Sequence, residues 1–421
     1  MNFKIALCLA VFLFGSATLA EKTRYDNYKL VHLTPKTPLH VQLVSEWEEK
    51  TEFDVWTRVK TTEESVHVLL SPEAYVKYSV LFTIFKIPFE ILENNMQKNF
   101  DEQERSMALS RNSRNIVGRY ARYTEIQSFI DNLAATSPLV TSDIAGKTYE
   151  GRNIKVAIIK TATSQRKIML DCGIHAREWI TPATCVYFID KLVNDYNSGN
   201  ALARELLGYY EIHVIPVLNP DGYEYSHTNT RLWRKNRRPN PGSSCIGTDL
   251  NRNFGFKWLT GGSSTDPCSD GYAGPSADSE LETKAFENYI NKYSGQWDSY
   301  LTLHSYGKWW FTPYGYTTTL PADFTELNAK AQIGISGIKA YGDGNGWTSG
   351  SSARILYIGS GGSEDWTYGV AGIKYSYSLE LRPGQSGIDA SYGFTLPEDR
   401  APKAGLETYG GIVTFLKAIK P

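Results

Sequence analysis

The sequence predicts an α/β protein in which helices cover both faces of a mixed central sheet, preceded by a small α+β domain. Strand-like and helix-like runs alternate from residue 123 to residue 419, the order typical of strands connected by helices over one sheet. Residues 23–71 follow a different order, with three short strand-like runs and one helical run. Residues 99–119 lie between these parts and combine many charges with few apolar residues, which is typical of an exposed connection.

The elements of the small domain are predicted from short apolar runs and one helix start. Strand-like runs span residues 28–33, 53–59 and 66–70, and a helical run spans residues 41–50. A second helix is predicted to begin at Ser71-Pro72, because proline is favoured at the first position of a helix.

The elements of the larger domain are predicted from the periodicity of its apolar residues. Helices are expected at 123–133, 181–196, 276–293 and 402–419, and strands at 154–160, 167–173, 210–218 and 374–381. The sequence Asn219-Pro220-Asp221-Gly222 has the composition of a turn. Ser276 or Asp278, placed before Glu280 and Glu282, forms a capping pattern that predicts the start of one helix.

Charge and cysteine usage limit the partners and the compartment. The formal net charge is −1, so no excess of Lys and Arg exists to neutralise a nucleic acid backbone. Residues 1–20 have the pattern of a secretory signal peptide, and no later stretch is apolar enough to anchor the chain in a membrane. Cys8 lies in that signal, and the other four cysteines allow three connectivities in an oxidising compartment. Sequence proximity favours Cys172 with Cys185 and Cys245 with Cys268.

A candidate metal site is predicted from one short motif and one distant histidine. His175 and Glu178 stand three residues apart, so both side chains leave the same side of a turn. Imidazole and carboxylate groups are ligands of catalytic zinc, which commonly takes three protein ligands and keeps one position open. His304, at the end of another strand-like run, offers the third ligand. No histidine follows Glu178 at the spacing of a His-Glu-x-x-His helix, so that endopeptidase motif is not indicated.

The positions of four polar residues indicate a single active site. Ligands of open α/β sheets bind at the carboxyl ends of the strands. His175, Glu178 and His304 lie at or just beyond predicted strand ends, and so does Glu380. We therefore expect the four side chains to meet.

A series of motifs resembles those of the secreted, pancreatic-type zinc carboxypeptidases of the A/B family. In chain order they are His175-Ala-Arg-Glu178-Trp, Asn219-Pro-Asp-Gly-Tyr223, Arg231-Leu-Trp-Arg234-Lys, Asp249-Leu-Asn251-Arg252-Asn253, His304-Ser-Tyr306, Tyr357 with Ser360-Gly-Gly, and Ser378-Leu-Glu380-Leu-Arg. One motif alone would be weak evidence, but their order is specific. The resemblance covers essentially the whole chain and implies the carboxypeptidase fold, with an amino-terminal pro-segment.

The resemblance implies a role for each residue of the metal site. His175, Glu178 and His304 would bind one Zn²⁺ ion per chain. Asp249 is similar to the carboxylate that orients the first histidine by accepting its other ring proton. Glu380 is similar to the general base of the family, which takes a proton from water and returns it to the leaving amine.

The resemblance also implies groups that bind the charges of a peptide substrate. Arg234 matches the cation that stabilises negative charge on the former carbonyl oxygen. Asn251 and Arg252 resemble the pair that binds the terminal carboxylate of the substrate. Tyr357 resembles the tyrosine that closes over this carboxylate, and Arg177 resembles an accessory arginine on the approach path. An exopeptidase is therefore expected.

Glu364 occupies the position that determines residue preference in this family. Members that prefer apolar carboxyl-terminal residues carry an aliphatic residue there, and members that prefer Lys or Arg carry Asp. A buried carboxylate favours a basic partner, because an apolar one would leave the charge unpaired. We expect a B-like preference for Lys and Arg; in the alternative, the longer Glu side chain turns away and the preference is apolar or mixed. The residues that match the pocket wall are small, namely Ser352, Gly315 and Ser378.

A second departure from the family pattern is the long loop at residues 383–389. We expect this loop to reshape the outer wall of the site. In that wall, Tyr306 and Phe394 would contact substrate residues upstream of the scissile bond.

These observations predict a secreted, extracellular and monomeric zymogen that acts on peptides and proteins with a free carboxyl terminus. The expected parts are a signal peptide (1–20), an activation pro-segment (21–111) and a catalytic domain (112–421). A trypsin-like protease would cut after Arg111 or Arg114; in the alternative, this stretch is a linker that is never cut.

Two competing functions are compatible with the same fold. A catalytically silent peptide-binding homologue would have lost Glu380 or a zinc ligand, and the sequence retains all of them. A neuropeptide-processing carboxypeptidase normally lacks a pro-domain of this type. The long amino-terminal segment therefore favours digestion or extracellular turnover.

Overall fold

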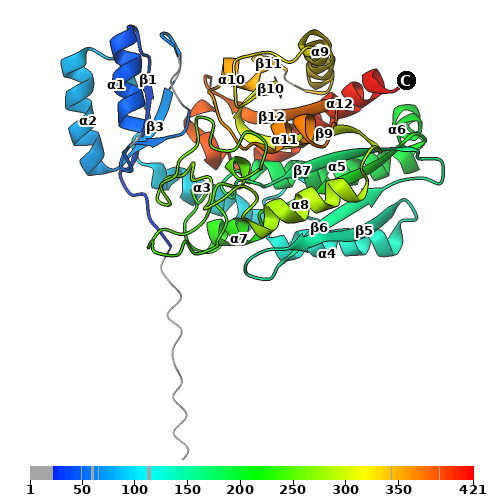
Figure 1. The fold of residues 1–421 in the computed structure, drawn as a ribbon. Helices are drawn as coiled ribbons and strands as arrows, with labels where there is room; N and C mark the ends of the chain where they lie inside the picture. The colour runs from blue at the N-terminus through cyan, green and yellow to red at the C-terminus, as the bar shows by residue number, and fades with distance from the viewer. Residues whose placement is uncertain are drawn as a thin grey trace, which may run out of the picture.

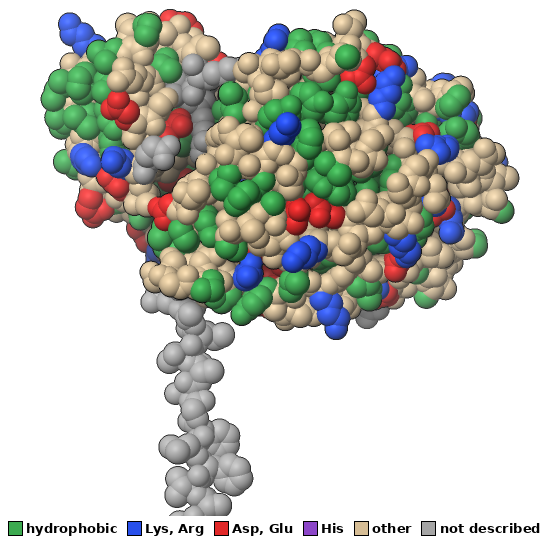
Figure 2. All heavy atoms as spheres, viewed as in Figure 1, with side chains coloured by type: hydrophobic (Ala, Val, Ile, Leu, Met, Phe, Trp, Pro, Cys, Tyr) green, Lys and Arg blue, Asp and Glu red, His purple; other side chains and the backbone are tan. Residues whose placement is uncertain are grey.

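The computed structural model describes residues 22–48, 50–57, 61–64, 66–110, 115–342, 344–387 and 389–421. The predicted signal peptide and the predicted cleavage sites at Arg111 and Arg114 lie outside the described residues. Figure 1 shows a small lobe (residues 22–93) against one side of a main body (residues 115–421). Figure 2 shows positive, negative and apolar side chains interspersed over the face in view, in agreement with the small net charge. Within the described ranges, no helix combines the length and the hydrophobicity needed to cross a lipid bilayer.

The small lobe is an antiparallel four-stranded sheet packed against two helices. Its elements are β1 (Lys29–Leu33), α1 (Pro38–Glu48), β2 (Asp54–Val55), β3 (Val66–Leu70), α2 (Pro72–Phe85) and β4 (Phe89–Glu93), with the strands in the order β2-β3-β1-β4. Helix α2 begins at Pro72, as predicted, because Ser71 Oγ accepts a hydrogen bond from Ala74 N at 3.1 Å. The predicted helix at 41–50 begins earlier, at Pro38. Of the predicted strand at 53–59, only Asp54 and Val55 form a strand among the described residues, and Trp56 N also donates to the carbonyl oxygen of His67 in β3 at 2.8 Å.

Helix α3 (Met96–Ser110) leaves the small lobe and packs on the main body. Asn99 donates a hydrogen bond to the carbonyl oxygen of Ser391 at 3.1 Å. Gln103 donates to the carbonyl oxygen of Leu396 at 2.9 Å and accepts from Arg231 at 2.8 Å. The charge-rich connection is therefore helical as far as Ser110, with buried polar contacts along one side of the helix.

The main body is built on a mixed sheet, as predicted, and this sheet has eight strands. The strands are β5 (Val140–Lys147), β6 (Asn153–Ile159), β7 (Arg166–Cys172), β8 (Tyr210–Ile215), β9 (Trp297–Gly307), β10 (Trp309–Thr312), β11 (Thr348–Ser351) and β12 (Tyr375–Gly384), in the order β11-β10-β12-β9-β7-β8-β6-β5. The central strands β12, β9, β7 and β8 run parallel, whereas β6 and β10 are antiparallel to their inner neighbours. Parallel central strands bring their carboxyl ends to one edge, where polar residues can meet.

Helices cover both faces of this sheet (Figure 1). Alternate strand residues belong to two hydrophobic cores, with Ile168 and Leu170 in one and Met169 in the other. The first core also contains side chains from α4 (Tyr123–Thr136), α5 (Ile180–Asn197), α6 (Ala201–Leu207), α9 (Phe324–Tyr341) and α12 (Ala401–Ile419). The second contains side chains from α8 (Leu281–Lys292) and α11 (Ser363–Gly369). The short elements α7 (Pro220–Thr228), η1 (Leu250–Arg252), α10 (Ser352–Ile355), η2 (Ala390–Thr395) and η3 (Glu398–Arg400) complete the body.

Two local predictions in the main body are wrong. The sequence Asn219-Pro220-Asp221-Gly222 is the first turn of α7 instead of an isolated turn, because Asn219 Oδ1 caps the helix by accepting from Gly222 N at 3.0 Å. Helix α8 begins at Leu281 instead of Ser276. Asp278 has a φ of 54°, outside helical conformation, and Glu280 N donates to Asn253 Oδ1 at 3.1 Å, which holds the preceding chain in a loop.

Candidate active site

All the residues predicted for metal binding, catalysis and substrate binding, apart from the pocket wall, line one cavity near the carboxyl ends of β7, β9 and β12. These residues are His175, Arg177, Glu178, Arg234, Asp249, Asn251, Arg252, His304, Tyr306, Tyr357, Glu364, Glu380 and Phe394. They come from segments separated by up to about 220 positions, so the sheet brings them together.

Local structure fixes the backbone around the first motif. Gly173, just after β7, has a φ of +65°, and a Cβ there would lie 3.1 Å from Pro182 Cγ. Glycine therefore allows the chain to turn toward His175 at this position. A disulfide between Cys172 and Cys185 joins the end of β7 to α5.

The three predicted ligands converge on one point. Nδ1 of His175 lies 3.1 Å from Nδ1 of His304 and 2.9 Å from Oε1 of Glu178. Nδ1 of His304 lies 3.3 Å from Oε2 of Glu178. All three side chains are buried, and they are the only group of this kind found among the described residues.

This donor set fits a zinc ion. A tetrahedral ion with bonds of about 2.0–2.1 Å separates its ligand atoms by about 3.3 Å, close to the distances between these three side chains. Lone pairs of two imidazoles and one carboxylate that face one another in a buried place repel unless a cation lies between them. The backbone N–H of Ser305 donates to Glu178 Oε2 at 3.2 Å and helps to orient that carboxylate.

Asp249 connects the histidine ligand to an arginine. Its Oδ1 lies 3.1 Å from Nε2 of His175, and its Oδ2 accepts from Arg234 at 2.8 Å. Burial alone would raise the pKa of Asp249, but Arg234 and His175 hold it well below the usual range. An ionised Asp249 accepts the outer ring proton of His175 and leaves Nδ1 free to bind a metal.

Glu380 lies beside His304 because the two residues are register partners in the parallel pair β12·β9. Burial raises the pKa of its carboxyl group to about 8, against the attraction of His304. Its Oε2 is buried and accepts no hydrogen bond from the described residues. This oxygen therefore remains available to hold a proton inside the cavity.

Two predicted carboxylate-binding residues lie on the short helix η1. Asn251 faces the metal ligands: its Nδ2 is 3.5 Å from Nε2 of His304, and its Oδ1 accepts from Ser363 N at 2.9 Å. Arg252 donates to the hydroxyl of Tyr357 at 3.0 Å. An amide and a guanidinium thus face the same cavity as the metal ligands, with the tyrosine in contact with the guanidinium.

The floor of the cavity is acidic. Glu364 is buried, and its Oε2 accepts no hydrogen bond from the described residues. A Cβ at Gly315 would lie 3.2 Å from Glu364 Oε1, so a small residue there gives the carboxylate room. Asp365, next in the chain, points elsewhere and accepts from Gly315 N and Tyr316 N at 3.0 and 2.9 Å. Burial and the charge of Glu364 raise the pKa of Asp365 well above its usual value.

Small and apolar side chains form the walls of the cavity around Glu364. Ser352 and Ser378 line the cavity, as predicted from the family pattern, whereas Gly315, also predicted for the wall, does not. Phe311 and Leu356, which the sequence did not single out, line it as well. The described residues of the loop at 383–389 do not line the cavity.

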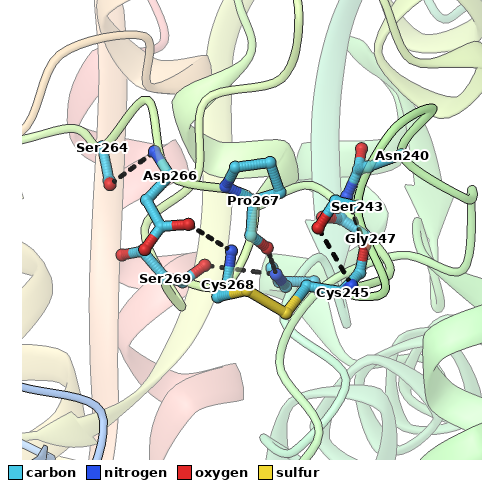
Figure 3. Close-up of a disulfide and its surroundings, with 10 residues drawn as sticks. Asn240, Ser243, Cys245, Gly247, Ser264, Asp266, Pro267, Cys268 and Ser269 are labelled. Carbon is cyan, nitrogen blue, oxygen red and sulfur yellow. Dashed lines mark hydrogen bonds between the residues drawn. A yellow bond between two sulfur atoms is a disulfide. The ribbon is translucent and has the colours of Figure 1, made fainter.

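Arg177 is buried, lines the cavity and has a partner that the sequence did not indicate. Its Nη1 donates to Asp270 Oδ2 at 3.2 Å, and its guanidinium carbon lies 4.3 Å from the ring centre of Phe394. Asp270 comes shortly after Cys268 in the chain. The disulfide between Cys268 and Cys245 links this loop to a neighbouring loop (Figure 3). Sequence proximity favoured both disulfide pairs that the structure contains.

The small lobe covers this site. Val55, Trp56 and Thr57 line the cavity, and the Trp56 ring lies 5.0 Å from that of Phe394. A Cβ at Gly393 would lie 2.3 Å from the Trp56 ring, so only glycine leaves space for this indole. In the sequence, only the presence of Trp56 in the predicted strand at 53–59 could have indicated this contact.

These features define a zinc-dependent peptidase with an attached covering domain. Residues 126–411 match the family model of zinc carboxypeptidases, and residues 31–103 match the carboxypeptidase activation peptide. The chain belongs to the zinc carboxypeptidase family, whose cofactor is Zn²⁺. It is 36% identical to carboxypeptidase B of Rattus norvegicus, covering 92% of this chain and 93% of the relative, and 34% identical to carboxypeptidase A2 of Mus musculus, covering 98% of both. The crystal structure of carboxypeptidase A from Helicoverpa armigera superposes with a TM-score of 0.85 at 27% identity, covering 94% of this chain and 98% of that one.

Proposed function

We propose that this chain is the zymogen of a secreted, monomeric carboxypeptidase that removes Lys and Arg from the carboxyl termini of peptides and proteins. Its proposed parts are a signal peptide (1–20), an activation pro-segment (21–111) and a catalytic domain (112–421). Membership in a family of zinc carboxypeptidases with activation peptides supports the reaction class. The preference for a basic residue is the further step, because relatives of both the A and the B kind are similar to this chain.

The buried carboxylate of Glu364 is the observation that carries the proposed preference. Its unpaired Oε2 lies in the same cavity as the metal ligands, between walls that include Ser352 and Ser378. A buried charge without a partner is costly, and a Lys or Arg side chain would supply the missing cation. A basic carboxyl-terminal residue therefore gains more at this floor than an apolar one.

In the proposed chemistry, the metal ligands, Glu380 and Arg234 each have a separate role. Zinc, when held by His175, Glu178 and His304, supplies an acidified water and a Lewis acid for the scissile carbonyl. Glu380 accepts the proton of the attacking water and passes it to the leaving amine, a role for which its Oε2, without a hydrogen-bond partner among the described residues, is available. Arg234, held by Asp249, presents positive charge to the oxygen that becomes negative.

An exopeptidase must also bind the terminal carboxylate of its substrate. Asn251 and Arg252 supply an amide and a planar guanidinium on one side of the cavity, and Tyr357 contacts that guanidinium. A guanidinium binds a carboxylate with two parallel hydrogen bonds. These groups favour a substrate with a free carboxyl terminus over an internal peptide segment.

The covered cavity supports the zymogen part of the proposal. Trp56 contacts Phe394, and His67 of β3 lies 2.9 Å from the hydroxyl of Tyr306. A peptide that approaches along Tyr306 and Phe394 meets the small lobe. A trypsin-like protease that cuts after Arg111 or Arg114 would release this cover.

One observation favours a second candidate preference. Phe311 and Leu356 line the same cavity as Glu364, and apolar walls suit an aromatic or aliphatic side chain. In this case the enzyme is the same exopeptidase with an apolar or mixed preference. A catalytically silent homologue is not favoured, because the metal ligands and Glu380 are all retained.

The test is hydrolysis of benzoyl-glycyl substrates that end in Arg, Lys, Phe or Leu, after mild treatment of the zymogen with trypsin. We expect kcat/KM to be highest for Arg and Lys and activity to vanish when a chelator is added. The same peptides with an amidated terminus serve as the control for exopeptidase action and should be cut at least about 10⁴-fold more slowly. Faster release of Phe than Arg would refute the basic preference, and equal rates for amide and acid would refute the exopeptidase assignment.

A further inference from the structure

The two histidine ligands have different partners on their outer ring nitrogens. His175 faces the carboxylate of Asp249 directly, at 3.1 Å. His304 faces a hydroxyl: Thr302 Oγ1 lies 3.3 Å from its Nε2, and the same oxygen lies 2.9 Å from Oδ1 of Asp171. The second histidine therefore reaches a carboxylate through one intervening threonine.

The direction of these hydrogen bonds follows from the chemistry of the donors. Nδ1 of His304 points into the ligand cluster, so its lone pair faces the metal position and the ring proton resides on Nε2. This proton needs an acceptor. The Nδ2 of Asn251, 3.5 Å away, cannot accept, because the Oδ1 of the same amide is committed to Ser363 N. Thr302 Oγ1 is the acceptor, and its own proton goes to Asp171.

The sheet holds the three groups at fixed spacing. Thr302 and His304 are two residues apart on β9, so their side chains project from the same face. Asp171 is the register partner of Thr302 in the parallel pair β7·β9. Asp171 and Thr302 are fully buried, so water does not compete for these hydrogen bonds.

We propose that Thr302 and Asp171 are positioning residues that orient the imidazole of His304 for metal binding. The proposal rests on the ligand role of His304 given above. The threonine accepts the Nε2 proton and the aspartate holds the hydroxyl in the accepting orientation. This pair thus serves His304 as Asp249 serves His175, with a neutral hydroxyl in contact with the ring in place of a charge.

The first experiment replaces the hydroxyl by a methyl group. The full-length zymogen and its Thr302→Val variant are stripped of metal, and Zn²⁺ affinity is measured by competition with a chromophoric chelator. Loss of such a partner typically weakens metal binding by about 10–100-fold, and we expect a loss in this range. Thr302→Ser keeps the hydroxyl and should bind Zn²⁺ nearly as tightly as the parent. The matched control is Thr312→Val, which removes a buried hydroxyl bonded only to the carbonyl oxygen of Pro313 among the described residues.

Thermal unfolding of the metal-free proteins distinguishes a positioning role of Thr302 from a general loss of stability. We expect Thr302→Val and Thr312→Val to lower the unfolding temperature by similar amounts, while only the first weakens Zn²⁺ binding. Unchanged Zn²⁺ affinity in Thr302→Val, or equal weakening in both variants, would overturn the proposal.

Two more variants identify the cause of any failure. His304→Ala should abolish tight Zn²⁺ binding; if it does not, the ligand assignment itself is wrong. Asp171→Leu should weaken Zn²⁺ binding in the parent but add nothing in the Thr302→Val background, because both changes break the same chain of hydrogen bonds. Additive effects of the two changes would contradict the relay from Asp171 through Thr302.

Discussion

The metal end and the floor of the cavity handle buried charge in opposite ways. At the metal end, Asp249 lies between His175 and Arg234, and both of its oxygens have partners. At the floor, Glu364 keeps a buried oxygen without a partner among the described residues, and so does Glu380 between the two ends. The metal end is organised around the ion that the protein holds, whereas the floor keeps an unpaired carboxylate, which the proposed preference assigns to a cation of the substrate.

This difference explains which changes should affect every substrate and which should affect only some. A group that acts at the scissile bond contributes to all turnover, whatever residue is removed. A group that pairs with the departing side chain contributes only when that side chain carries charge. Glu380 and Glu364 line one cavity, and each has a buried Oε2 without a partner among the described residues, so they provide the sharpest contrast.

The largest effect is expected for Glu380→Gln, which keeps the shape of the side chain and removes its ability to take a proton. General-base catalysis contributes about 10²–10⁴-fold, so kcat/KM should fall by that factor on Arg-, Lys-, Phe- and Leu-ending substrates alike. Steady-state kinetics of the trypsin-treated enzyme measure the loss. Zn²⁺ content should stay at one ion per chain, because Glu380 is not one of the three convergent ligands.

Glu178→Gln is the matched control for this variant. It makes the same chemical change within the ligand group and should lose Zn²⁺ together with activity. A Glu380→Gln enzyme with nearly full activity, or one that loses Zn²⁺, would remove the distinction between the base and the metal ligands.

The next effect is expected for Glu364→Leu, which should change the preference and leave catalysis intact. Breaking one partner of a buried ion pair costs about 3–5 kcal/mol, so kcat/KM for Arg-ending substrates should fall at least about 100-fold. Release of Phe or Leu should rise, because an apolar floor no longer leaves a charge unpaired. The ratio of kcat/KM between Arg- and Leu-ending substrates measures the change.

Asp365→Asn serves as the control for Glu364→Leu. Its carboxylate binds Gly315 N and Tyr316 N and does not line the cavity, so the Arg-to-Leu ratio should stay within a few fold of the parent. If Glu364→Leu leaves that ratio unchanged, the floor carboxylate does not select the substrate and the apolar preference is favoured.

The fold was predictable where sequence patterns have one structural meaning. The apolar runs that became β7, β8 and β12 and the periodic helices α5 and α12 were predicted to within a few residues. The sequence Asn219-Pro220-Asp221-Gly222 was misassigned because the same residues suit both an isolated turn and a capped helix start with proline at its first position.

The site was predictable where a motif carried it, and unpredictable where only register or loop packing did. His175, Glu178 and Glu380 belong to motifs, so their convergence could be anticipated. Thr302 and Asp171 meet because two strands pair in one register, which no local pattern specifies. Asp270 reaches Arg177 through a loop 93 residues away, and nothing in its sequence neighbourhood indicates that contact.

The smallest effect concerns the docking of the small lobe on the catalytic domain and its dependence on pH. His67 of the small lobe lies 2.9 Å from the hydroxyl of Tyr306, and burial, aided by His32, lowers the pKa of His67 to about 4 from 6.5. The docked state therefore disfavours protonation, so docking is unaffected above pH 6.5 and is weakened as pH falls from 6.5 toward 4. At pH 5 this shift weakens docking by at most about 30-fold relative to pH 8, because the contact with His32 lies within the small lobe and persists when the lobe leaves.

Asp54 acts in the opposite direction, so the His67 effect must be measured against a variant. Burial, with Asp270 adding to it and Arg177 opposing it, raises the pKa of Asp54 to about 6 from 3.8, which favours docking as pH falls. The His67→Gln variant removes the contribution of His67 to this pH dependence and keeps that of Asp54. After trypsin cleavage, the amount of small lobe that remains bound to the catalytic domain is measured by size-exclusion chromatography at pH 8 and pH 5. We expect the ratio of docking constants, parent over His67→Gln, to fall by up to about 30-fold between these pH values. A ratio independent of pH would mean that His67 takes up its proton without leaving Tyr306, so that His67 does not make docking sensitive to acid.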